Sequence, residues 1–254
     1  MATVDVLGPF QVVKRPLTLK PPATQANEPP SGTEGAVAWW KFDETEGTTA
    51  ADSAANGLAG RLQGQTRWAR GQGHSGNALA LDGAGGFVDC GDAEQLDFRE
   101  ALTISAWFKV QRFDKTWQTL VAKGAGAWRL QRHENGDLLD FTVDGVEADK
   151  KKGRGWAEVV SKRPVADGQW HHVVSVYDGK RLALYLDGTL ENTTPVTGRM
   201  AANNEPVLIG ENPSKRGRYF DGWLDDVRLY GRALSDKGIQ ALYRGVVETA
   251  EAAK

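Results

Sequence analysis

The chain has four histidines and one cysteine, the residue types that hold transition metals. His171 and His172 are adjacent in a stretch expected to be a β-strand, so their side chains point to opposite faces and cannot chelate one ion together. His74 and His133 stand alone in the sequence, and Cys90 is the only thiol. The sequence therefore argues against a transition-metal centre, and Cys90 cannot form an internal disulfide.

Acidic residues could serve glycoside hydrolysis, which needs two carboxylates facing each other across a sugar. Asp137, Asp140 and Asp144 bracket one predicted strand, and the spacing of three places Asp137 and Asp140 on opposite faces. The sequence also lacks the Gly-x-Ser-x-Gly string of a nucleophile elbow. We therefore expect a protein that is not an enzyme.

Tryptophan side chains favour binding. Trp117, Trp128 and Trp156 fall in the central predicted strands and loops, where an amphipathic ring could stack on a sugar or anchor a protein loop. The alternative is that each ring fills the core of a large sandwich. The basic run from Lys150 to Arg154 is typical of a solvated loop, and could otherwise meet an acidic glycan or partner.

The charge balance narrows the choice of partners. Lys and Arg number 31 against 33 Asp and Glu, and the net charge of -2 gives no general attraction to nucleic acid or anionic lipid. No apolar run approaches the ~20 residues that cross a bilayer, and residues 1–10 do not read as a secretory signal. We expect no nucleic-acid partner and no membrane insertion.

The elements that would position these residues are mostly strands. From Ala36 to Tyr230, short apolar or alternating runs are separated by Gly, Asp and Asn, which is typical of antiparallel strands joined by turns. Only the spacing of Ile239, Leu242, Tyr243, Val246 and Val247 is helical, with Ser235 as a predicted N-cap. The predicted strands are 36–42, 58–62, 78–81, 87–90, 102–110, 119–123, 128–132, 138–143, 156–161, 171–177, 181–186, 206–210 and 217–230. The expected fold class is all-β, a two-sheet antiparallel jelly-roll sandwich with one short C-terminal helix.

Six of the ten prolines fall in the first 30 residues and predict an extended arm. The expected division is an arm or linker over 1–35, a jelly-roll domain over 36–247 and a tail over 248–254. Apolar residues of the arm, such as Phe10 and Leu17, would need a cover. We expect the arm to lie extended over a surface, either of the same jelly roll or of another subunit. The reach of the Pro-rich spacer 21–30 favours docking on another subunit.

Seven spaced motifs occupy 40–44, 52–57, 75–79, 102–109, 168–173, 184–188 and 220–230. Together they resemble the LamG-like jelly roll of the concanavalin A-like lectin/glucanase superfamily. The resemblance covers roughly residues 36–245, and it implies the two-sheet fold that lectins, adhesion modules, spacers and hydrolases share. The Glu-x-Asp-x-x-Glu string of the hydrolases is absent.

The resemblance also implies a structural calcium ion at the rim of the sandwich. Its expected oxygen ligands are Asp52 and Asn56, from a short loop, together with Asp225 and Asp226 from the last strand. The alternative is an Asx turn beside ordinary surface acids. Ala54 and Ala55 replace the Ser-Gly that the family usually has in that loop.

Together these features predict a non-catalytic binding or adhesion module that recognises a carbohydrate or glycoprotein. Its expected place is extracellular, periplasmic or at the cell surface. A structural subunit docked through its N-terminal arm is the alternative. A glucanase-type glycoside hydrolase is a weaker alternative, because the paired carboxylates are missing.

Overall fold

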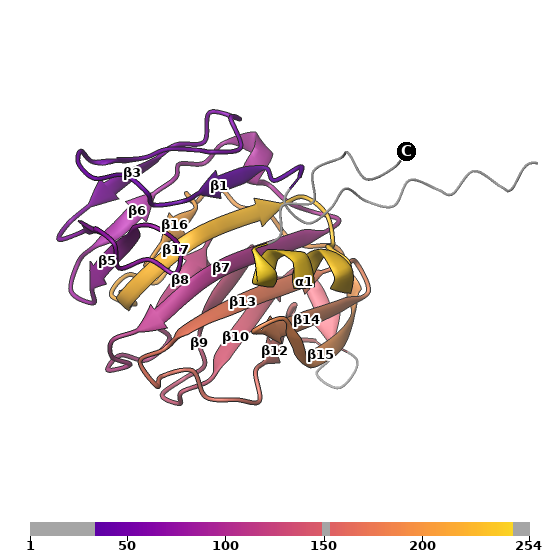
Figure 1. Ribbon diagram of the computed structural model, residues 1–254. Helices are drawn as coiled ribbons and strands as arrows, with labels where there is room; N and C mark the ends of the chain where they lie inside the picture. Colours follow the sequence, from indigo (N-terminus) through magenta and orange to yellow (C-terminus); the bar gives the residue numbers. More distant parts are fainter. Residues whose placement is uncertain (1–33, 149–152, 246–254) are drawn as a thin grey trace, which may run out of the picture.

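The computed structural model describes residues 34–148 and 153–245 as two stacked antiparallel sheets with a helix on the outside (Figure 1). The predicted arm, apart from Glu34 and Gly35, lies outside the described residues, as do Val246, Val247 and the predicted tail. Within the described ranges, no helix is long and apolar enough to cross a membrane.

The first sheet has nine strands in the order β11-β15-β14-β13-β7-β17-β5-β4, with β1 paired to β17. Its central strand β7 lies between β13 and β17 and therefore forms the middle of one face of the molecule (Figure 1). The strands are β1 (Ala38–Trp40), β4 (Arg67–Ala69), β5 (Ala78–Asp82), β7 (Leu102–Val110), β11 (Val146–Ala148), β13 (Trp170–Tyr177), β14 (Arg181–Leu186), β15 (Thr189–Gly198) and β17 (Asp221–Tyr230).

The second sheet has eight strands in the order β12-β10-β9-β8-β16-β6-β3-β2. It packs against the first, and the predicted all-β sandwich is confirmed. One short 3-10 helix, η1 (Glu94–Leu96), lies between β6 and β7. The strands are β2 (Thr49–Ala50), β3 (Gly60–Gln63), β6 (Phe87–Asp89), β8 (Thr119–Ala122), β9 (Trp128–Arg132), β10 (Leu139–Asp144), β12 (Trp156–Val160) and β16 (Leu208–Ile209).

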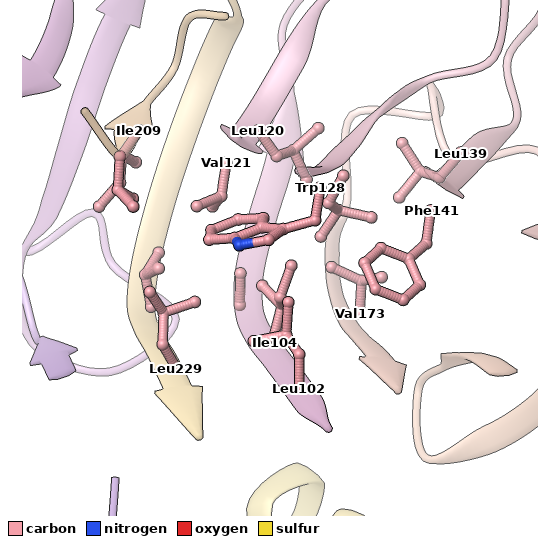
Figure 2. Packing of buried hydrophobic residues seen from close by; sticks show 14 of the residues in the cluster. Leu102, Ile104, Leu120, Val121, Trp128, Leu139, Phe141, Val173, Ile209 and Leu229 are labelled. Carbon is pink, nitrogen blue, oxygen red and sulfur yellow. The ribbon is translucent and has the colours of Figure 1, made fainter. Parts of the chain in front are cut away.

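The core lies between the two sheets because alternate side chains of each strand point inward. In β9, Trp128 and Leu130 point inward while Arg129 points out. Figure 2 shows the indole of Trp128 surrounded by aliphatic side chains of both sheets, and none of its surface is exposed. The register of β9 places Trp128 in the core, as the alternative to a ligand-binding role expected, and leaves none of its ring exposed to a ligand.

Helix α1 (Asp236–Arg244) covers the outer face of the nine-stranded sheet (Figure 1). The predicted N-cap is confirmed, since the hydroxyl of Ser235 accepts a hydrogen bond from the backbone N–H of Gly238 at 3.2 Å. Ile239 and Leu242 pack with residues of β13, β14 and β17. This cover buries Ser105 and Trp107 on the outer face of β7, so the strand is buried on both faces.

A β-bulge interrupts β17 where it pairs with β7. The register shifts between Asp225 and Arg228, and Asp226 is the inserted residue with a φ of 50°. Leu224 and Val227 on either side still face the core. The bulge therefore turns two consecutive carboxylates, Asp225 and Asp226, toward the outer face.

Candidate functional site

A cavity of 540 Å³ opens on the outer face of the nine-stranded sheet beside the C-terminal end of α1, and we call it the α1 cavity. Five separate parts of the chain build it: the β1 region, the loop before β5, strand β7, strand β17, and α1. Residues from these parts that matter to its chemistry are Trp39, His74, Trp107, Asp225, Arg228 and Tyr243. Its volume lies in the range of about 300–1,000 Å³ that small-molecule sites usually have.

Two neighbouring rows of residues, paired across β13, β7 and β17, form the sheet around the cavity. In one, Trp107 of β7 is in register with Asp225 of β17 and His172 of β13. In the next, Ser105 is in register with Arg228, and its hydroxyl lies 2.9 Å from Nε2 of His172. Burial is the main cause that lowers the pKa of His172 to about 3, so this imidazole is neutral.

Aromatic rings stack on the sheet beside the cavity. The imidazole of His74 lies flat on Trp107, with ring centroids 3.3 Å apart and planes 9° apart. The ring of Tyr243 stacks near the same indole at 5.7 Å. Trp107 is thus held between a loop and the helix, which explains why only 7% of it is exposed.

The two carboxylates of the bulge are held differently. Asp225 is 1% exposed and accepts a hydrogen bond from the backbone N–H of Ser75 at 3.0 Å. Burial, followed by the charges of Asp226 and Asp43, raises the pKa of Asp225 to about 7. Near neutral pH this carboxyl can therefore either donate or accept a hydrogen bond.

Asp226 fixes the neighbouring indole and guanidinium. Its Oδ1 accepts hydrogen bonds from Nε1 of Trp39 at 2.7 Å and from Nη2 of Arg228 at 3.2 Å. The guanidinium of Arg228 lies 4.3 Å from the centre of the Trp39 ring. Arg228 is 8% exposed, and its Nε has no hydrogen-bond partner among the described residues. A buried donor of this kind costs free energy until an acceptor reaches it.

The four residues predicted to bind calcium do not form one site. Asp52 Oδ1 accepts from the backbone N–H groups of Trp39 and Ala54, and Oδ2 accepts from those of Asn56 and Leu58, all within 3.1 Å. Four hydrogen bonds use the lone pairs of this carboxylate that a metal ion would need.

The other three predicted ligands have different partners or lie in a different place. The amide nitrogen of Asn56 donates to the carbonyl groups of Ala36 and Val37, whereas Asp225 and Asp226 line the α1 cavity. No group of three or more His, Cys, Asp or Glu in the part of the chain that the structure describes is arranged to hold a metal ion. The residues present therefore do not fit the expected calcium ion, and Asp52 matches the Asx-turn alternative.

The two other predicted ligand residues lie on the outer side of the eight-stranded sheet, and both are half-buried. Trp117, just before β8, meets His133 edge to face at 5.6 Å and has Arg218 5.7 Å from its ring centre. Trp156, on the edge strand β12, has Arg154 5.1 Å from its ring centre. Neither contributes to the α1 cavity.

A family model described as the concanavalin A-like lectin/glucanases superfamily matches residues 82–240, more than half of the chain. The chain belongs to this superfamily. The LamG-like resemblance is therefore confirmed, while the fold itself hosts several functions.

Solved structures share the fold at low sequence identity. The binding domain of Paraclostridial Mosquitocidal Protein 1 matches with a TM-score of 0.67 and 15% identity, over 84% of this chain and 53% of that chain. Domain 4 of AbnA, an extracellular arabinanase from Geobacillus stearothermophilus solved in complex with arabinotriose, gives 0.63 and 18%, over 82% and 98%. The binding domain of botulinum neurotoxin DC in complex with SialylT gives 0.61 and 14%, over 86% and 53%. The chain spans about half the length of the two toxin domains.

Proposed function

We propose that this chain is a non-catalytic carbohydrate-binding module whose ligand enters the α1 cavity. The observation that carries the proposal is the juxtaposition, in one cavity, of partly exposed aromatic rings with accessible carboxylates. The rings are those of Trp39, His74 and Tyr243, and the carboxylates are those of Asp43 and Asp226. A sugar presents apolar C–H faces for the rings and hydroxyls that both donate and accept.

The fold relatives support this reading. Domain 4 of AbnA was solved with arabinotriose and the neurotoxin domain with SialylT, so two proteins of this fold are recorded with glycans. The cavity also supplies both cationic donors and anionic acceptors, since Lys41 and Arg228 line it together with Asp43 and Asp226. A mixed lining of this kind suits a polyhydroxyl ligand better than a strongly charged one. We further propose that the module acts outside the cell, as the extracellular arabinanase does.

The test begins with a glycan array, followed by calorimetric titration of the glycans that bind. Tyr243→Ala should weaken binding about ten-fold, the order expected when an aromatic anchor is truncated. His74→Ala, which removes an exposed ring from the loop side, should weaken it in the same direction. Thermal melts show whether each variant remains folded.

Trp156→Ala and Trp117→Ala are the matched controls, because each removes a half-buried aromatic ring on the opposite sheet. We expect both to keep the wild-type affinity. If these controls lose binding while Tyr243→Ala keeps it, the ligand lies on the outer side of the eight-stranded sheet. If no array glycan binds the wild-type chain, the proposed function is wrong.

A further inference from the structure

A second depression of 370 Å³, which we call the loop pocket, shares one wall with the α1 cavity. That wall is Trp39, which lines both. The rest of the loop pocket comes from the start of the described chain at Gly35 and Ala36 and from Ser53, Ala54 and Asn56. Two depressions of ligand-binding size thus meet at a single tryptophan.

The two depressions lie on opposite sides of Trp39. Strand β1 is an edge of the nine-stranded sheet, with Trp39 in register with Arg228 of β17 on one side. On its other side, Trp40 forms a bridge with Asp52, and the N–H of Ser53 donates to the carbonyl of Trp39. The α1 cavity includes residues of β7 and β17, whereas the loop pocket includes residues 53, 54 and 56.

We infer that the protein binds an oligosaccharide that passes over Trp39, with one sugar in the α1 cavity and the next in the loop pocket. This inference rests on the proposed function and names its ligand class, a chain of linked sugars. A single sugar would use only one of the two depressions.

The shared wall is fixed before any ligand arrives. Nε1 of Trp39 donates to Asp226, and its ring has two cations near its centre, Lys41 at 4.5 Å and Arg228 at 4.3 Å. A ring held by a hydrogen bond and two cation–π contacts loses little freedom when a ligand packs against it. Trp39 is therefore suited to separate two subsites.

The 52–58 loop forms the other wall of the loop pocket, and the carboxylate of Asp52 holds this loop in place. It binds the backbone N–H groups of residues 39, 54, 56 and 58, so it ties the 52–58 loop to β1. Ser53 and Asn56 are exposed on this loop and bring a hydroxyl and an amide oxygen to the loop pocket, while the amide nitrogen of Asn56 donates to the carbonyl groups of residues 36 and 37. These are the groups that pair with sugar hydroxyls.

Affinity should therefore depend on the length of the sugar chain. The probes are arabinose and arabino-oligosaccharides of two to six units, with xylo- and laminari-oligosaccharide ladders in parallel, each titrated calorimetrically against the full chain. For the ladder that binds, we expect the affinity of the wild-type protein to rise about ten-fold when a second subsite is filled and then to level off.

Ala54→Trp tests the loop pocket, because a large side chain there should fill it without touching the α1 cavity. The variant should bind long and short members of the ladder equally, at the wild-type affinity for the short ones. Ala59→Trp is the matched control, since Ala59 is exposed in the same segment and lines neither depression. Ser53→Trp, at an exposed position, replaces Ala54→Trp if that variant does not fold.

The outcomes separate this inference from the proposed function. A length dependence that survives in folded Ala54→Trp or Ser53→Trp overturns the second subsite. Equal affinity of the wild-type chain for short and long sugars overturns it as well, while the α1 cavity keeps its role. Failure of every ladder and every array glycan to bind overturns both proposals.

Discussion

Asp52 illustrates how one carboxylate can be used up by the chain's own backbone. Its four hydrogen bonds come from N–H groups of β1 and the 52–58 loop. Asp52→Ala leaves these donors without an acceptor and should lower the free energy of unfolding by about 3 kcal/mol, measured by urea denaturation. Asp52→Asn keeps one acceptor oxygen and should lose less.

A parallel measurement with a chelator distinguishes this role of Asp52 from metal binding. Because the structure assigns Asp52 to the backbone, the difference in stability between wild type and Asp52→Ala should be the same with and without excess EDTA. A wild-type melting temperature that falls in EDTA and recovers with calcium, while that of Asp52→Ala stays constant, would restore the calcium site.

His171 is the histidine whose ionisation should affect stability most directly. Its Nδ1 lies 3.0 Å from Asp187 Oδ2 and its Nε2 lies 3.1 Å from Asp167 Oδ1. The hydrogen bond with Asp187 is the main cause that raises the pKa of His171, although burial opposes it. A raised folded pKa means that the stabilisation is fully present below the unfolded value of about 6.5 and is lost as pH rises through the folded value.

His171→Gln should therefore destabilise the protein more at pH 6.0 than at pH 8.5, measured by urea denaturation at both pH values. The glutamine can still form neutral hydrogen bonds, so the comparison isolates the charge. An equal loss of stability at the two pH values would contradict the assignment of the protonated form.

At the scale of elements, α1 was the most predictable part of the site. The sequence places Ser235 before the apolar spacing, and the structure confirms it as the N-cap of Asp236–Arg244. Ser235→Ala should lower the free energy of unfolding by about 1 kcal/mol, and Ser235→Asp should restore it. Urea denaturation of both variants measures the effect. Equal destabilisation by Ala and Asp would show that the cap contributes nothing.

Strands with clear alternation and Asp-Gly turns were also predictable. The bounds of β7, β9 and β14 agree with the sequence pattern, whereas β15 was missed although it has ten residues. Its sequence is polar and contains Pro195, and only Glu191 and Val196 are buried within it. Such a strand is set by pairing with β14 and β11 and has no hydrophobic pattern of its own.

The bulge in β17 could not be read from the sequence either. Asp225 and Asp226 look like neighbours that alternate between faces, and only the register against β7 shows that Asp226 is inserted. The same limit applies to Trp128, whose inward direction depends on the phase of β9 against the core.

For the whole molecule, the fold followed from local patterns but the α1 cavity did not. Trp39, His74, Arg228 and Tyr243 are separated along the chain and carry no common motif. They meet because β17 pairs with both β1 and β7 and because α1 returns over the same face (Figure 1). A cavity formed by tertiary packing leaves no spacing signal in a single sequence, so the sequence instead drew attention to Trp117 and Trp156.

The outer face of the eight-stranded sheet carries two carboxylates that the spacing along a single strand does not reveal. Asp140 of β10 and Glu158 of β12 lie on the outer face of the eight-stranded sheet, where Glu158 is in register with Thr142. Two carboxylates on neighbouring strands are a possible acid–base arrangement in principle. Reasoning from the spacing along one strand cannot find such a pair.

Asp140 is nevertheless unsuited to act on a sugar. None of its surface is exposed, its Oδ1 accepts from Thr142 at 2.7 Å, and its Oδ2 lies 3.5 Å from Nδ1 of His133. Burial raises its pKa, but a general acid must also reach the glycosidic oxygen. We therefore expect no release of reducing ends from arabinan, xylan, β-glucan or galactan. If Asp140→Asn abolishes cleavage and the exposed-site control Asp137→Asn retains it, the outer face of the eight-stranded sheet is catalytic.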